Sequence, residues 1–153
     1  MEYIIKILSS HKIRPSHHRI CVLKYLIQNK THPTVEDILT GLAPVMPTIS
    51  RATIYNTLHV LQEAGLVMAL HESGSETRFD YRYRNHAHFY CIQCGRYIDV
   101  NTEYDCFNTR AIGPHSVNEV LVYFRGVCAD CASGKKSEKT NKDKKTKKGG
   151  SES

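Results

Sequence analysis

The chain has 153 residues, of which 41% are hydrophobic, and a formal net charge of +6 at pH 7. This length suits one or two small globular domains with modest cores. No apolar run reaches the length of a membrane span, and the first residues, MEYIIKILSSHK, lack a cleavable signal pattern. We therefore expect a cytoplasmic protein with no membrane partner, in which the six cysteines are thiols or metal ligands rather than a disulfide framework.

The positive charge is concentrated at the C-terminus. Residues 135–153, KKSEKTNKDKKTKKGGSES, hold eight of the 21 Lys and Arg and three of the 15 Asp and Glu, so this tail carries +5 and the rest carries +1. A tract without apolar residues cannot bury enough surface to offset its ordering entropy, so we predict a disordered tail. A solubilising role is favoured, and a nonspecific attraction to DNA phosphates is the alternative.

Three helices are predicted in the first 42 residues. Apolar positions indicate a short helix over Glu2–Leu8 and a longer one around Ile20–Ile27. Thr34 is suited to cap a third helix, VEDILTGL, and Asp37 stands three residues later, as in a capping box.

A fourth helix is predicted in SRATIYNTLHVLQEAGLV, with Ser50 as its N-cap and Gly65 as its C-terminal stop. Ile54, Leu58 and Leu61 are spaced to lie on one buried stripe. The opposite face carries side chains that can contact phosphates, base edges or a thymine methyl group: Arg51, Thr53, Tyr55, Asn56 and His59.

Two β-prone runs, Leu66–Leu70 and Thr77–Tyr83, follow this helix and are separated by HESGSE, which predicts a hairpin. Helices followed by a hairpin are typical of a winged helix-turn-helix, whose last helix enters the DNA major groove. The alternative is a small helical domain with a polar surface helix.

Two C-x-x-C units, Cys91 with Cys94 and Cys128 with Cys131, favour one structural zinc site of four thiolates. A redox dithiol is the competing interpretation, but no thioredoxin-type βαβ pattern surrounds either pair. Cys21 lies on an apolar helix stripe and is read as a structural thiol, while Cys106 has no partner at metal spacing.

The segment HAHFYC contributes to a different site. On a strand, His86 and His88 point to one side while Cys91 points to the other. Imidazoles with carboxylates suit iron or manganese, whereas thiolates suit zinc. Candidate partners for the histidines are Asp80, Asp99 and His32, although sequence spacing alone does not establish that they converge.

The motifs HPT (32–34), SRATIYNTL (50–58), RFD (78–80), HAH (86–88), CIQCG (91–95) and GVCADC (126–131) together resemble the Fur family of metal-dependent regulators. The resemblance covers roughly residues 11–134. It implies an α+β homodimer with a winged-helix DNA-binding domain at 1–83 and a small α/β dimerisation domain with a four-cysteine zinc site at 84–134. Within the family, the peroxide-regulator (PerR) branch is most similar, because Asp stands at position 99, where iron and zinc sensors commonly have Glu, and Asn follows Tyr55.

In that branch, the regulatory ion is held at positions matching His32, Asp80, His86, His88 and Asp99. The resemblance implies that bound Fe²⁺ reduces peroxide, that His32 or His86 is oxidised, and that Mn²⁺ supports DNA binding with far less of this chemistry. We therefore expect a peroxide-sensing repressor of double-stranded operator DNA and not an enzyme, the alternative being a Fur-type iron or manganese uptake regulator. The chain departs from the family at Ser16–Arg19, SHHR, where a proline that favours the first helical turn is missing. Arg19 is an expected DNA-contact residue, and the departure is expected to alter DNA contacts or the entry of that helix.

Overall fold

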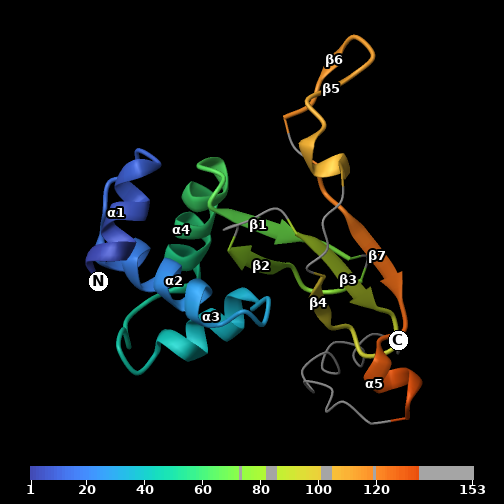
Figure 1. Cartoon of the computed structure of the whole chain (residues 1–153). Coiled ribbons are helices and arrows are strands. Elements are labelled where there is room, and N and C mark those ends of the chain that lie inside the picture. Colours follow the sequence, from blue (N-terminus) through green and yellow to red (C-terminus); the bar gives the residue numbers. More distant parts are fainter. Residues whose placement is uncertain (73, 82–85, 101–104, 119, 135–153) are drawn as a thin grey trace, which may run out of the picture. The chain divides into compact units, whose positions relative to one another are not determined.

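The computed structural model describes residues 1–72, 74–81, 86–100, 105–118 and 120–134 (Figure 1). The chain divides into two compact units, Met1–Asn85 and His86–Ser153. The predicted domain boundary at residues 83 and 84 and the predicted disordered tail lie outside the described residues. Within the described part of the chain, no helix combines the length and apolar character needed to cross a membrane.

The first unit contains four helices: α1 (Glu2–Ser10), α2 (His17–Gln28), α3 (Val35–Leu42) and α4 (Arg51–Glu63). The predicted caps are present at the N-termini of two of them. The Thr34 hydroxyl accepts from the Asp37 backbone N–H, and the Asp37 carboxylate accepts from the Thr34 N–H, which completes the capping box of α3. The Ser50 hydroxyl accepts from the backbone N–H of Thr53 at 3.1 Å and caps α4. Local hydrogen-bonding chemistry therefore sets where these helices begin.

Helix α4 ends as predicted, at a glycine with a left-handed backbone. Gly65 has φ +70°, its N–H donates to the Gln62 carbonyl, and the Leu66 N–H donates to the Leu61 carbonyl. This pair of bonds is the Schellman arrangement, which satisfies carbonyls that the helix end leaves unpaired. Leu61 and Leu66 are both buried, so the turn also directs the chain into the following strand.

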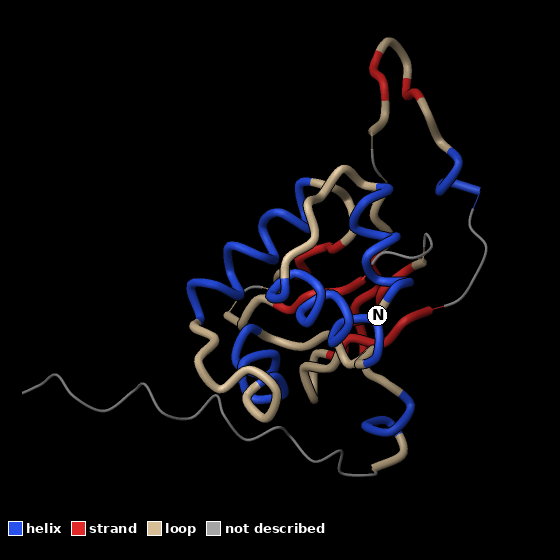
Figure 2. The backbone as a smooth tube through the Cα atoms, turned by 90° about the vertical axis from the view of Figure 1, so that its left-hand side faces the viewer, coloured by secondary structure: helices blue, strands red, loops and turns tan. Residues whose placement is uncertain are grey.

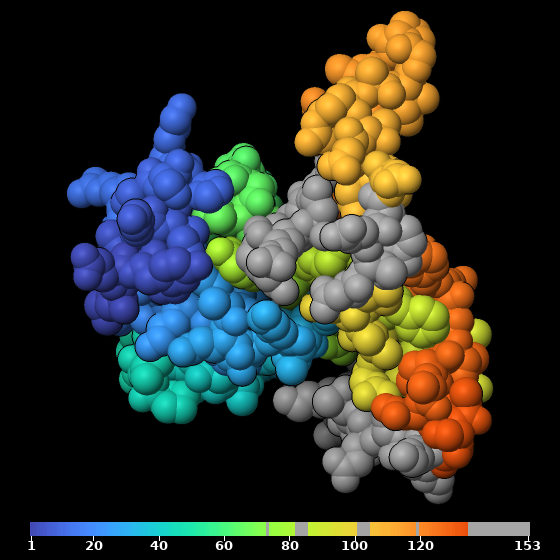
Figure 3. Space-filling view, viewed as in Figure 1, coloured from blue at the N-terminus to red at the C-terminus, as the bar shows by residue number. Residues whose placement is uncertain are grey.

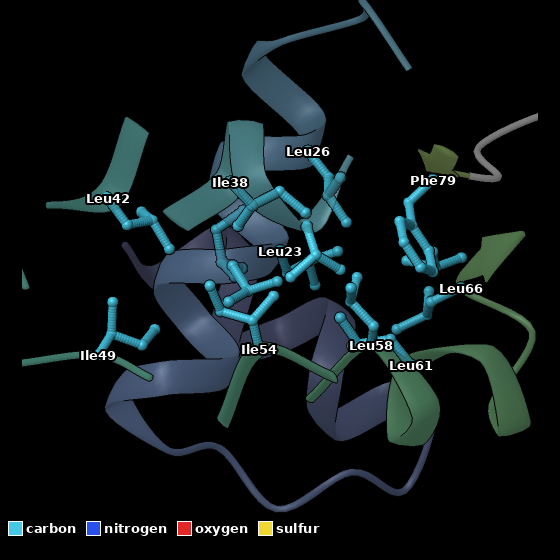
Figure 4. Packing of buried hydrophobic residues seen from close by; sticks show 14 of the residues in the cluster. Leu23, Leu26, Ile38, Leu42, Ile49, Ile54, Leu58, Leu61, Leu66 and Phe79 are labelled. Carbon is cyan, nitrogen blue, oxygen red and sulfur yellow. The ribbon is translucent and has the colours of Figure 1, made fainter. Parts of the chain in front are cut away.

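The helices enclose one continuous apolar core (Figure 4). Ile54, Leu58 and Leu61 of α4 are buried as predicted. Among the apolar residues of α2, Val22, Leu23 and Leu26 are fully or almost fully buried, whereas Ile20 and Ile27 only pack against the core. Helix α2 contacts α1, α3, α4 and β2, so a single 3.6-residue stripe does not describe its buried surface.

The predicted hairpin is present as β1 (Val67–Leu70) and β2 (Arg78–Tyr81), paired antiparallel with Val67 opposite Tyr81. In Figure 2 the helices are drawn in blue and the strands in red. Phe79 of β2 joins the helical core, and its neighbour Asp80 is buried but lies outside that core. The order of four helices followed by a hairpin is that of a winged helix-turn-helix.

The second unit is built on a three-stranded sheet in the order β4–β3–β7. Strand β3 (Ala87–Cys91) pairs antiparallel with β4 (Tyr97–Val100) and parallel with β7 (Tyr123–Gly126). A 3-10 helix, η1 (Asp105–Asn108), and a hairpin of β5 (Ala111–Ile112) and β6 (His115–Ser116) lie between β4 and β7 in sequence, and α5 (Ala129–Ala132) follows β7. The β5 and β6 residues are all exposed (Figure 3). Helices, two antiparallel strand pairs and one mixed sheet in the described residues make the chain an α+β protein.

Candidate metal centres and DNA-contact surface

The four predicted zinc cysteines converge in the second unit. Parallel pairing places Cys91, the last residue of β3, opposite Gly126 at the end of β7, so the two C-x-x-C units follow neighbouring strands at one end of the sheet. The Sγ atoms of Cys91 and Cys131 are 3.8 Å apart, and those of Cys94 and Cys128 are 3.9 Å apart. All four sulfurs lie within 4.8 Å of one another. Four thiolates about 2.3 Å from a tetrahedral Zn²⁺ lie about 3.8 Å apart, so the cluster suits a zinc site.

The first C-x-x-C unit forms a tight turn that directs both of its sulfurs inward. Gly95 has φ +71°, its N–H donates to the Cys91 carbonyl at 2.8 Å, and the Cys91 N–H donates to the Arg96 carbonyl at 3.0 Å. A residue with a Cβ would be strained at this φ, which explains the glycine directly after Cys94. The glycine therefore fits the tight turn that holds the first cysteine pair.

Hydrogen bonds in this turn also favour the thiolate of Cys91. Burial of the side chain acts to raise its pKa, but N–H groups of Cys128, Cys94 and Gln93 donate to the sulfur and lower the pKa to about 6. The Cys128 N–H is 3.3 Å from this sulfur. Because the thiolate is the form that binds metal, Cys91 is prepared as a ligand at neutral pH.

Within the second unit, His86 and His88 face the carboxylate of Asp99. The β3–β4 register places His88 directly opposite Asp99. The Nε2 atoms of His86 and His88 are 3.3 Å and 3.7 Å from Asp99 Oδ1, and the two imidazole rings are 4.5 Å apart. Ligand atoms each about 2.1 Å from one ion lie about 3.0 Å apart at a right angle and about 3.4 Å apart at a tetrahedral angle. These three side chains are thus spaced to bind one ion, and they are distinct from the cysteine cluster.

Within the first unit, His32 and Asp80 lie close together. His32 is 3% exposed, and its Nε2 is 3.9 Å from Asp80 Oδ1. The loop that carries His32 is bound to β2, because Arg78 donates to the His32 carbonyl and the Phe79 N–H donates to the Pro33 carbonyl. His32 has φ +51°, a conformation that is uncommon for residues other than glycine and is tolerated where the surroundings hold it. The strained loop therefore presents an imidazole beside a buried carboxylate.

The predicted DNA-contact residues lie on the outer side of α4 and near the start of α2. Tyr55 and Asn56 are exposed, and Thr53 is half-buried, with its hydroxyl 2.9 Å from that of Ser50. A polar groove of about 530 Å³ includes Arg14, His18, Arg19, Thr53 and Asn56 in its lining. Arginines beside hydroxyl and amide groups match the chemistry of a DNA backbone contact.

Two arginines of this surface are held by protein acceptors. The Arg51 guanidinium donates to Glu36 Oε2 of α3 from both Nε (2.9 Å) and Nη2 (2.8 Å). Arg19 donates from Nη1 to the Arg14 carbonyl at 2.8 Å. Both guanidinium groups are therefore oriented by other residues of the protein. To contact a phosphate, Arg51 would either leave Glu36 or bind Glu36 and the phosphate together. Sequence patterns did not indicate either contact. The Arg51–Glu36 pair depends on the packing of α3 against α4, whereas Arg19 and Arg14 are five residues apart.

The remaining cysteines lie outside both metal clusters. Cys21 is half-buried against the core and its Sγ is 3.9 Å from His17 Nε2. Cys106 is exposed in η1. Arg96 donates to the cysteine cluster and to Asp130, although the sequence analysis did not single out either residue. Arg96 directly follows the motif C-x-x-C-G, and Asp130 lies inside the second C-x-x-C unit. Their positions beside the cysteines could have indicated a role at the cluster.

Comparison with known proteins finds similar sequences and similar structures. Residues 10–110 match the sequence model described as the ferric uptake regulator family. The chain is 37% identical over 136 residues to the peroxide-responsive repressor PerR of Staphylococcus aureus strain Mu50, covering 86% of this chain and 90% of that protein. The crystal structure of the Campylobacter jejuni peroxide stress regulator is similar with a TM-score of 0.67 and 27% identity, covering 83% of this chain and 98% of that one.

The ferric uptake regulator of Vibrio cholerae has the same fold, with a TM-score of 0.60, 23% identity, and coverage of 81% of this chain and 98% of that one. At this identity the likeness supports the fold alone.

Proposed function

Because the chain belongs to the ferric uptake regulator family of transcription regulators, we propose that it is a metal-dependent repressor that binds operator DNA and senses hydrogen peroxide. One observation carries the proposal: the imidazoles of His86 and His88 face a single carboxylate, Asp99, in a chain 37% identical to a peroxide-responsive repressor. Two imidazoles and a carboxylate are ligands that suit iron and manganese.

The regulatory ion is proposed to take ligands from both units. His86, His88 and Asp99 come from the second unit, and His32 with Asp80 from the first. The short distances within each set support this assignment, as does the family resemblance of all five positions. An ion held in this way restrains the angle between the DNA-binding unit and the rest of the subunit.

Peroxide sensing follows from the identity of the ion. The five side chains would hold Fe²⁺, which would supply one-electron chemistry with hydrogen peroxide beside the imidazoles, whereas Mn²⁺ would supply far less of it. His32 and His86 are the residues expected to be oxidised. An oxidised imidazole is a weaker ligand, so the restraint between the units is lost.

Loss of that restraint reduces DNA binding. In a dimer, the two α4 helices must reach major grooves about one helical turn, roughly 34 Å, apart. Loss of about 3 kcal/mol of preference for the binding-competent form lowers its ratio to other forms more than a hundredfold. Repression is then lifted.

A homodimer is proposed to form through the second unit. Tyr123 and Phe124 of the edge strand β7 are 42% and 38% exposed, so apolar surface is available on both faces of this strand. Exposed, hydrophobic edge strands are usually covered in soluble proteins, and a second copy of the chain would cover this one. Zinc at the cysteine cluster, which holds the end of β7, would support such an interface.

The test is binding to operator DNA by the Fe²⁺-loaded and Mn²⁺-loaded proteins, before and after brief peroxide treatment. Only the Fe²⁺ form is expected to lose affinity, and mass spectrometry should find one added oxygen on the peptide with His32 or His86. Equal sensitivity of both forms would contradict iron-mediated sensing. Release of DNA on chelation but not on peroxide treatment would instead indicate an iron or manganese uptake regulator.

A further inference from the structure

A single guanidinium lies across both halves of the cysteine cluster. Arg96 Nε donates to Cys94 Sγ at 3.3 Å, and Nη2 is 3.5 Å from Cys128 Sγ. Cys94 belongs to the first C-x-x-C unit and Cys128 to the second, so one side chain connects segments that are far apart in sequence. The third contact, at 2.6 Å, joins Arg96 Nη2 to Oδ2 of Asp130, a residue between Cys128 and Cys131 in the second C-x-x-C unit.

We propose that Arg96, oriented by Asp130, is a positioning residue that lowers the reactivity of the zinc-binding sulfurs and keeps zinc bound in the presence of peroxide. Four thiolates around one Zn²⁺ carry a net charge of −2, so their sulfurs remain electron-rich. Donors on a cation are the partners that most reduce this electron density, because charge-assisted hydrogen bonds are about twice as strong as neutral ones.

The shape of the guanidinium explains why arginine is present. Its planar group carries N–H donors in a fixed fork, so Nε and Nη2 reach two sulfurs while the second Nη2 hydrogen is directed to Asp130. A lysine ammonium is a point charge on a flexible stem and cannot hold this arrangement. Asp130 therefore orients the donor without binding the metal.

The ion pair itself contributes little to folding. The side chains of Arg96 and Asp130 are 43% and 53% exposed, and solvent-exposed pairs of this kind add at most about 1 kcal/mol. The effect of Arg96 is thus expected in the chemistry of the sulfurs and not in the stability of the fold. A change in sulfur reactivity without a loss of stability therefore distinguishes a positioning role from a merely structural one.

The reaction that Arg96 suppresses is oxidation of a thiolate by hydrogen peroxide. The sulfur attacks one peroxide oxygen, the O–O bond breaks, a sulfenic acid forms and hydroxide leaves, so sulfur loses two electrons and peroxide gains them. A neighbouring thiolate then attacks the sulfenic sulfur, the S–O bond breaks, a disulfide forms and hydroxide leaves, and zinc is lost. Sulfur pairs separated by 3.8 and 3.9 Å are close enough for this second step.

The biological meaning of this protection rests on the proposed function. A peroxide sensor must oxidise one ligand set while leaving its structural zinc site intact in the same solution. Arg96 supplies that difference in reactivity for the cysteine cluster. Its effect on zinc can be measured without the regulatory ion, so failure of the sensing proposal and failure of this inference are distinguishable.

The test is the rate of zinc release from full-length protein without regulatory metal, treated with hydrogen peroxide and followed with a chromogenic chelator. Arg96→Ala is expected to release zinc about 10-fold faster than the unmodified chain, the lower end of the range for loss of a partner to metal ligands. Arg96→Lys should fall between the two. Arg110→Ala removes the same charge from an exposed residue of the same unit and should release zinc at the unmodified rate.

Asp130→Asn tests the orienting role. It should release zinc at an intermediate rate, and adding it to Arg96→Ala should cause no further increase. Independent effects of the two substitutions would overturn the role given to Asp130. Equal rates for Arg96→Ala and Arg110→Ala would overturn the proposal.

A spectroscopic measurement guards against a variant that folds poorly. In protein with Co²⁺ at the cysteine cluster, loss of donors to sulfur raises the energy of the sulfur electrons, so Arg96→Lys and Asp130→Asn should shift the sulfur-to-cobalt charge-transfer band to longer wavelength. The circular dichroism spectrum of each variant should stay unchanged. An unshifted band in both variants would contradict the proposal even if zinc release were faster.

Discussion

The two units of this chain are stabilised in different ways. The first unit contains a continuous apolar core contributed by all four helices and the hairpin. In the described part of the second unit, the buried hydrophobic side chains are Ala87, Cys91, Tyr97, Phe107 and Cys128, two of which belong to the cysteine cluster. Domains this small often need a metal because they bury too little apolar surface. The comparison suggests a test: a metal ion held by the cysteine cluster would stabilise the second unit as the helical core stabilises the first.

Removing a zinc ligand should have the largest effect and should be confined to the second unit. Cys128→Ser is expected to lose stoichiometric zinc and the stability that zinc supplies, which is about 10–16 kcal/mol for small structural sites. Hydrogen exchange resolved by mass spectrometry should lose protection in β3 and keep it in α4. Cys106→Ser, an exposed thiol outside the cluster, is the matched control. Full zinc content in Cys128→Ser would contradict the role given to the cysteine cluster in stabilising the second unit.

The converse change is a cavity in the core of the first unit. Leu58 is 1% exposed, so Leu58→Ala should destabilise this unit by about 2–5 kcal/mol through lost burial and an incompletely filled cavity. Zinc content should remain at that of the unmodified chain. Denaturant unfolding with parallel zinc analysis measures both quantities, and coupled loss of zinc would mean that the units are stabilised together.

Removing the charge of Asp99, the carboxylate that faces His86 and His88, should weaken binding of the regulatory ion and leave binding of the structural ion unchanged. Asp99→Asn keeps the shape of the side chain but removes its charge, so Mn²⁺ affinity should fall by more than about 100-fold, beyond the usual effect of losing a partner of a ligand. Zinc content should not change. Calorimetric titration with Mn²⁺ makes the measurement, with Asp105→Asn in exposed η1 as control. Unaltered Mn²⁺ affinity would remove Asp99 from the proposed site.

The smallest expected effect is at a helix cap of the first unit. Ser50→Ala removes the acceptor for the Thr53 N–H and should cost about 1 kcal/mol of stability. For a domain of this size the corresponding shift is about 4–8 °C in the thermal midpoint of the first unit. Ser9→Ala, an exposed serine of α1, should change the midpoint far less. Equal shifts in the two variants would show that the Ser50 cap adds no stability.

Local signals correctly predicted much of the first unit. The caps at Thr34 and Ser50 and the stop at Gly65 involve residues within five positions of one another, so their hydrogen bonds follow from neighbouring residue types. The burial of α2 was less predictable, because that helix touches four other elements and its surroundings are set by the whole unit. The short hairpin β5–β6 and the 3-10 helix η1 gave no periodic signal and were not predicted.

For the sites, the residue types and their spacing determined the chemistry. Paired C-x-x-C units predicted a thiolate cluster, and alternation along a strand predicted that Cys91 points away from His86 and His88. Only the tertiary structure decided the convergence. Parallel pairing of β3 with β7 brought the cysteine pairs together, and the β3–β4 register set Asp99 opposite His88. Contacts such as Arg96 with Cys128 and Asp130 depend on that pairing across the sheet. The physical reason is the separation of the residues along the chain. Residue types specify hydrogen bonds between near neighbours, whereas strand pairing depends on the free energy of the whole unit.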